Sequence, residues 1–244
     1  MFLLTSLIAC LILSLFMPFL GQKVLERRIV FVDLALAQIA ATGYAVGLAT
    51  DSSGPLWAAV VTVVAVFGFG ALSHASKLPK EAVMGSIYAV AAAAGMILLS
   101  TLPHAEGHMS DLMFGSLLGI GWDNFGLLVG ACLLSITLLR FSGSDSYARR
   151  VLFYLALAIA VVPAIHAVGI VLVFAMLLLP ALAVWQHEEN GPLWQAIVVA
   201  MLGSVTGVVA AEYMDLPPSS TVVLALFLCG LPIFVWRSTT SSVS

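Results

Sequence analysis

Three side chains suited to metal binding alternate along one polar stretch of the sequence. His104, Glu106 and His108 form an H-x-E-x-H pattern, and Asp111 follows three residues later. Imidazole nitrogens and carboxylate oxygens are ligands for divalent ions such as zinc and manganese. The pattern is therefore a candidate metal-collecting site. A solvated polar loop that ends a helix accounts for the same residues, and the sequence leaves both interpretations open.

Motifs for enzyme chemistry are absent from the 244 residues. Neither the G-x-x-x-x-G-K-[ST] phosphate loop, nor H-E-x-x-H, nor G-x-S-x-G occurs in the sequence. Cys10, Cys132 and Cys229 lie singly in apolar runs, without the paired spacing of a zinc or redox site. We therefore expect no catalytic residue, no cofactor in this chain and no ATPase site of its own.

The composition is that of a membrane protein. Hydrophobic residues make up 62% of the chain and charged residues only 9%, and the mean hydropathy is +1.14. A soluble domain carries about 25% charged residues, so the composition excludes a soluble enzyme. The net charge of −3 gives no basic surface for phosphate backbones, which excludes a nucleic-acid binder.

Hydropathy predicts an all-α fold, a polytopic transmembrane helical bundle that forms a single domain over residues 1–244. About 20 apolar residues are needed for each membrane-spanning helix. Pro163 and Gly169 interrupt the segment 151–185, which forms either two short helices or one long broken helix, so the count is eight or nine spans. The candidate spans are 1–20, 30–50, 55–73, 82–101, 124–141, 151–165, 167–185, 192–212 and 219–236.

Lys and Arg residues predict the orientation of the chain in the membrane. Eight of the nine positive residues lie near three alternate loops, at 21–30, 74–81 and 140–150. Short loops rich in Lys and Arg face the cytoplasm, so these three loops are predicted to be cytoplasmic. The segment 102–123 then lies outside, where Asp111–Gly119 is apolar enough for a short extracytoplasmic interfacial helix.

Several stretches, taken together, resemble the membrane permease subunit of ABC importers for zinc, manganese and iron. Two arginines at 27–28 are followed by glycines at 43 and 47, and an aromatic-Gly-x-Leu pattern occurs at 114–117. The most specific stretch is Val168–Ala181, a Val-Gly run that ends in Pro-Ala. The last loop and span, from Tyr213 onward, also fit. The resemblance covers roughly residues 20–235 and identifies the chain as a divergent member.

The resemblance also implies a substrate path, with departures from the family pattern. The family typically has an Asp-x-x-Ser-His motif before these glycines. Anchored on Gly43, its three polar positions fall on Leu34, Ala37 and Gln38, and the nearest carboxylate, Asp33, is one residue early. His166 stands where the family often has Gln. We therefore expect Gln38, Asp33 and His166 to contribute polar atoms to the path.

The same resemblance implies the partners and the function. It implies a homodimer or a paired permease, two cytoplasmic ATPase subunits that bind the ATP, and an extracytoplasmic metal-binding protein, in the cytoplasmic (inner) membrane of a prokaryote. The expected activity is import of zinc, manganese or iron. The residues expected to couple the permease to the ATPase are Asp145, Tyr147, Arg149 and Arg150. Two alternatives stay open: a secondary carrier of a small solute, and a non-transporting scaffold derived from such a permease.

Overall fold

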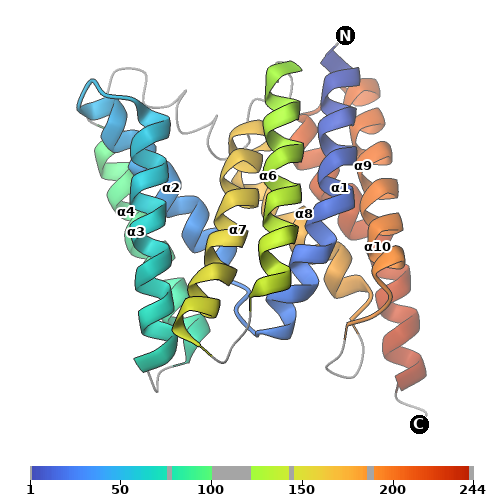
Figure 1. The fold of residues 1–244 in the computed structure, drawn as a ribbon. Coiled ribbons are helices and arrows are strands. Elements are labelled where there is room, and N and C mark those ends of the chain that lie inside the picture. Colours follow the sequence, from blue (N-terminus) through green and yellow to red (C-terminus); the bar gives the residue numbers. More distant parts are fainter. Residues whose placement is uncertain (1, 76–78, 101–121, 143–145, 186–189, 242–244) are drawn as a thin grey trace. The chain divides into compact units, whose positions relative to one another are not determined.

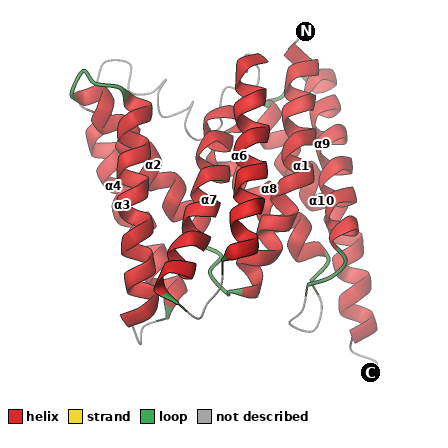
Figure 2. Cartoon of the chain, in the orientation of Figure 1, coloured by secondary structure: helices red, strands yellow, loops and turns green. Residues whose placement is uncertain are grey.

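The computed structural model describes residues 2–75, 79–100, 122–142, 146–185 and 190–241. These residues form nine helices and no strand (Figure 2). In chain order (Figure 1), the helices are α1 (Phe2–Glu26), α2 (Val32–Ala49), α3 (Gly54–Ala75), α4 (Lys80–Ser100), α6 (Trp122–Phe141), α7 (Tyr147–Val168), α8 (Ile170–Ala183), α9 (Leu193–Met214) and α10 (Pro218–Ser241).

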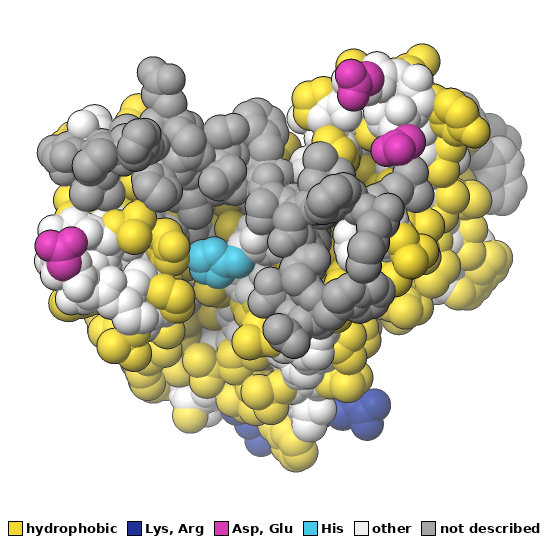
Figure 3. Space-filling model, turned by 90° about the horizontal axis from the view of Figure 1, so that it is seen from above, with side chains coloured by type: hydrophobic (Ala, Val, Ile, Leu, Met, Phe, Trp, Pro, Cys, Tyr) yellow, Lys and Arg dark blue, Asp and Glu magenta, His cyan; other side chains and the backbone are white. Residues whose placement is uncertain are grey.

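Most of these helices match the hydrocarbon core of a membrane in length and composition. Seven of them are long and apolar enough to cross it, and α8 is a shorter apolar helix. At 1.5 Å per residue, the 14 residues of α8 reach about 21 Å, less than the roughly 30 Å of a bilayer core. Hydrophobic side chains, in yellow, cover much of the described surface seen in Figure 3. The predicted polytopic helical bundle is thus confirmed.

The chain divides into two compact units, and the first contains α1, α8, α9, α10 and the last residues of α7. In this unit α1 packs against α8 and α9, and α10 packs against α8 and α9. Glycines allow the close contacts: a Cβ on Gly21 would lie 1.8 Å from the Leu177 carbonyl oxygen, and one on Gly207 would lie 2.5 Å from Val222 Cα. A buried hydrogen bond of 2.8 Å joins the Ser14 and Ser204 hydroxyls of α1 and α9.

The second unit contains α2, α3 and α4, with most of α6 and α7. Helix α2 packs on both α3 and α4. A Cβ on Gly43 would lie 2.8 Å from the Trp57 carbonyl oxygen of α3. Small residues thus let these helices approach closely. By contrast, a Cβ on Gly126 or Gly130 of α6 would meet no described atom within 4 Å.

Two helix boundaries differ from the sequence prediction. Helix α1 continues to Glu26, through residues expected in a loop, because Gly21 packs on α8 and Gln22 makes a tertiary hydrogen bond. The segment 151–185 forms two helices that are separated by Gly169 alone. Gly169 has φ 89° and ψ 159°, a conformation that is essentially restricted to glycine. Pro163 lies inside α7 and does not end it.

Candidate functional site

Asp33 is the most unusual of the predicted path residues. It lies in the first turn of α2, where the positive end of the helix dipole favours a carboxylate. The side chain is 1% exposed, and Oδ1 has no hydrogen-bond partner among the described residues. Burying a polar group without a partner costs several kcal/mol. Ionisable residues inside a membrane are rare and mark functional positions, so Asp33 is the leading site residue of the second unit.

A second carboxylate lies at the same end of this unit. Glu81, in the first turn of α4, accepts a hydrogen bond from the backbone N–H of Val30, with an N···Oε1 distance of 3.4 Å. This contact holds the segment that leads into α2. The first turns of α2 and α4 therefore each carry an acidic residue, and the contact between Glu81 and Val30 could not be predicted from the sequence.

Gln38 lies on a different side of α2 from Asp33. Five residues correspond to about 140° around an ideal helix, and α2 is continuous through both positions. The half-buried Gln38 side chain faces α4: its Nε2 is 3.6 Å from where a Cβ on Gly95 would lie. One turn later, the Thr42 hydroxyl is 2.8 Å from the Gln38 carbonyl oxygen and 2.9 Å from the Ala91 carbonyl oxygen of α4. Thr42 thus bridges α2 and α4, a role that the sequence analysis missed.

His166 belongs to the first unit and is exposed in the last turn of α7. Pro163, one turn earlier, has no N–H and so leaves the carbonyl of Ile159 without its helical donor. After the helix ends, the buried Ser219 hydroxyl at the start of α10 donates a 3.3 Å hydrogen bond to the Val168 carbonyl. His166 therefore lies next to a helix break where backbone carbonyl oxygens lack their usual helical donors. An imidazole and such carbonyl oxygens are polar groups that a substrate path could use.

The predicted coupling residues are only partly described. Asp145 lies outside the described residues. Tyr147 begins α7 and is 42% exposed, and its hydroxyl donates a 3.2 Å hydrogen bond to the Phe67 carbonyl oxygen of α3. Arg149 is exposed and Arg150 half-buried. The Tyr147 ring therefore ties the start of α7 to α3, in addition to any contact with a partner.

The candidate metal-collecting residues, His104, Glu106 and His108, also lie outside the described residues. Within the part of the chain that the structure describes, no three His, Cys, Asp or Glu side chains gather into a group that could hold a metal ion. The H-x-E-x-H site therefore stays a prediction.

Hydrogen bonds between the end of α1 and residues 190–191 form a polar clamp, which the sequence did not predict. The Gln22 side chain, 6% exposed, donates a 2.8 Å hydrogen bond to the Gly191 carbonyl oxygen. Asn190 donates to the Glu26 carboxylate, which also pairs with Lys23 at 2.9 Å. The clamp fixes the segment that leads into α9. The only signal in the sequence is a glutamine at the end of an apolar run.

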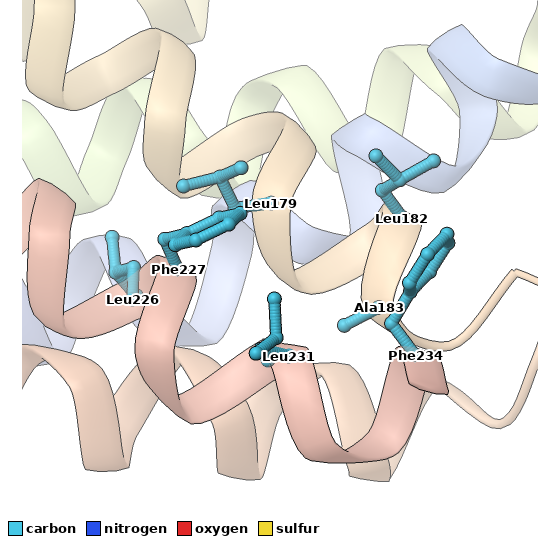
Figure 4. A pocket seen from close by; sticks show the side chains of 8 residues that line it. Leu179, Leu182, Ala183, Leu226, Phe227, Leu231 and Phe234 are labelled. Atoms are coloured by element: carbon cyan, nitrogen blue, oxygen red, sulfur yellow. The ribbon is translucent and has the colours of Figure 1, made fainter. Parts of the chain in front are cut away.

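An apolar groove of about 250 Å³ lies between α8 and α10 in the first unit (Figure 4). Leucine side chains of both helices and phenylalanine side chains of α10 converge on the groove, and no polar side chain lines it. The groove therefore offers no ligand to an ion, and the polar candidates remain those on α2, α4 and α7.

The fold and these features define a helical membrane protein with several spans. Residues 1–148 and 141–237 match the sequence profile of the ABC 3 transport family (ABC-3), and the chain belongs to this family.

Individual relatives align with nearly the whole chain. It is 26% identical to a probable iron transport system membrane protein of Haemophilus influenzae, in an alignment that covers 94% of this chain and 91% of that protein. It is 20% identical to the manganese transport system membrane protein MntC of Halalkalibacterium halodurans, over 90% of this chain and 82% of that one. A chain of PsaBC from Streptococcus pneumoniae, solved in complex with a Fab, has the same fold, with a TM-score of 0.74, 20% identity and coverage of 96% and 91%.

Proposed function

We propose that this chain is the membrane permease subunit of an ATP-driven importer of a divalent metal ion, with manganese or iron as substrate ahead of zinc. The observation that carries the proposal is the ABC-3 family match, which extends over residues 1–237. Relatives that align with nearly the whole chain are named as iron and manganese transport proteins. The sequence has no phosphate loop, so the energy must come from partner subunits that bind ATP.

The buried carboxylate of Asp33 supports a cationic substrate. A cation that passes Asp33 would supply the partner that its Oδ1 lacks among the described residues. Gln38 adds a neutral amide, which binds a divalent ion more weakly than an imidazole or a carboxylate does, and His166 adds an imidazole. A weak ligand such as the amide suits passage, because a path that held the ion tightly would trap it.

The proposal includes the assembly and its location. Two copies of this chain, or this chain and a related permease, would pair in the cytoplasmic membrane of a prokaryote. Two ATPase subunits would dock on the cytoplasmic side at the loop that carries Asp145 and Tyr147, and a metal-binding protein would deliver the ion from outside. Closure of the ATPases on ATP would then open and close the path alternately.

Metal uptake into sealed vesicles tests the function. Vesicles that contain this chain and its ATPase should accumulate Mn²⁺ or Fe²⁺ when ATP and the loaded binding protein are supplied. Vesicles with a hydrolysis-deficient ATPase are the control and should accumulate none. Uptake that continues without any ATPase would favour a secondary carrier, and the absence of uptake of all three metals would favour the scaffold.

A further inference from the structure

The connection between α9 and α10 is a short, rigid turn. Helix α9 ends at Met214, and Asp215 adopts a left-handed conformation with φ 52° and ψ 44°. The backbone N–H of Leu216 bonds back to the Ala211 carbonyl oxygen at 3.0 Å. Pro218 begins α10, and the Thr221 hydroxyl bonds to the Pro217 carbonyl oxygen at 2.9 Å. Hydrogen bonds on both sides of the turn therefore hold its backbone conformation.

This turn presents large apolar side chains to its surroundings. Tyr213 is 88% exposed, Met214 is 68% exposed and Leu216 is 45% exposed. We call residues Glu212–Leu216 the α9–α10 tip. Tyr and Met are enriched at protein–protein interfaces, and a backbone that hydrogen bonds already hold has little conformational entropy to lose when a partner covers it. The tip therefore has the composition and rigidity of a contact hot spot.

A hollow of about 180 Å³ lies beside the tip, and its lining is partly polar. It is bounded by the start of α1 at Ser6, by Glu212 and Asp215 of the tip, and by Pro218 of α10. Both carboxylate residues are exposed. A protruding side chain of a partner can therefore enter a recess whose polar rim is acidic, next to the exposed Tyr213.

The described positive side chains of the first unit lie away from the tip. Its described Lys and Arg residues are Lys23, Arg27, Arg28 and Arg237. The first three lie at or just after the end of α1, whereas the hollow lies at the start of that helix. Arg237 is 19 residues along α10 from Pro218, or about 29 Å. Among the described residues of the first unit, the end that carries the tip is therefore acidic and has no Lys or Arg, which favours a partner with a basic face.

We propose that the α9–α10 tip is a docking surface for the extracytoplasmic binding protein, which would place a basic side chain in the hollow and cover Tyr213. The assignment rests on the proposed function, because it takes the tip to face outward as the Lys and Arg distribution predicts. An aromatic residue at a helix end is also typical of membrane headgroup contact. Trp194, 64% exposed at the opposite end of α9, is the matched control for that alternative.

The test is a binding measurement on the complete permease–ATPase complex in lipid nanodiscs. The probe is the Mn²⁺-loaded binding protein of the same transport system, measured by its association and dissociation kinetics. Tyr213→Ala should weaken binding about tenfold, as loss of a hot-spot side chain does, and Trp194→Ala should leave it within twofold. Glu212→Gln with Asp215→Asn should slow association severalfold at low salt and flatten its salt dependence. Asparagine tolerates the left-handed conformation at position 215.

The outcomes separate this inference from the proposed function. Thermal unfolding of each variant in nanodiscs shows whether the turn is intact. If the wild-type complex transports metal but the tip variants bind like the wild type, the docking surface is wrong and the transport function stands. If Trp194→Ala weakens binding as much as Tyr213→Ala, the tip has no special role and the inference is overturned. If the wild-type complex neither binds the probe nor transports metal, both proposals fail.

Discussion

Replacing Gly21 by alanine tests the close contact between α1 and α8. A Cβ at this position would lie 1.8 Å from the Leu177 carbonyl oxygen and 3.2 Å from Ala181 Cβ. The first distance is about 1.6 Å short of the 3.4 Å at which ordinary contact begins. The obstacle is backbone and not the flexible end of a side chain, so the two helices must separate for the methyl group to fit.

The expected cost follows from this separation. Overpacking a close contact typically costs about 1–3 kcal/mol, and we expect Gly21→Ala to fall at the upper end of that range. The adjacent Gln22 would also lose its 2.8 Å bond to the Gly191 carbonyl oxygen, because its backbone moves with residue 21. The segment that leads into α9 would then loosen together with α1.

The assay is a titration of the purified protein in mixed micelles with a denaturing detergent, which gives the midpoint of unfolding. Gly68→Ala in α3 is the control, because its Cβ would meet no described atom within 4 Å and alanine favours the helix by up to about 1 kcal/mol. We expect the midpoint for Gly21→Ala to fall clearly below that of the wild type and that of Gly68→Ala. Equal midpoints for the two variants would refute the close α1–α8 packing.

Three further predictions concern orientation, coupling and the path. In a variant without native cysteines, Arg149→Cys should resist a membrane-impermeant thiol reagent in intact cells, and ready labelling from outside would reverse the orientation. Tyr147→Ala should lower the metal transported per ATP hydrolysed severalfold, whereas Tyr147→Phe, which loses only the hydrogen bond to α3, should keep coupling and lose about 1 kcal/mol of stability. Gln38→His should raise zinc uptake and His166→Ala should lower uptake of all metals; unchanged uptake in both would exclude these residues from the path.

The helices of this protein could be predicted from its sequence because the membrane imposes a simple rule. Each span needs about 20 apolar residues, so hydropathy alone found α2, α4 and α9 within a few residues of their ends. It failed for α1 after residue 20, since Gln22 and Lys23 resemble a loop until their tertiary partners are known. It also left open whether 151–185 forms two short helices or one long broken helix, because the break at Gly169 depends on a backbone conformation.

The candidate site was less predictable for a related reason. Residue types and a family resemblance selected Asp33, Gln38 and His166, but the burial of Asp33 depends on which helices cover it. The Thr42 bridge between α2 and α4 depends on a carbonyl of Ala91, 49 residues away. Side chains whose role is set by a distant backbone group carry no local signal in the sequence.

The packing of α1 with the last helices constrains the order in which the protein can assemble during synthesis. The residues of α1 that pack in the first unit include Leu13 and Met17, both fully buried, and the partners of α1, helices α8 and α9, are translated more than 140 residues later. Until then α1 lacks these packing partners. The Ser14 hydroxyl can then donate a hydrogen bond only to the Cys10 carbonyl of its own helix. The first unit is therefore completed after the second has been synthesised. A chain that ends before α8 therefore leaves α1 without the helices on which it packs.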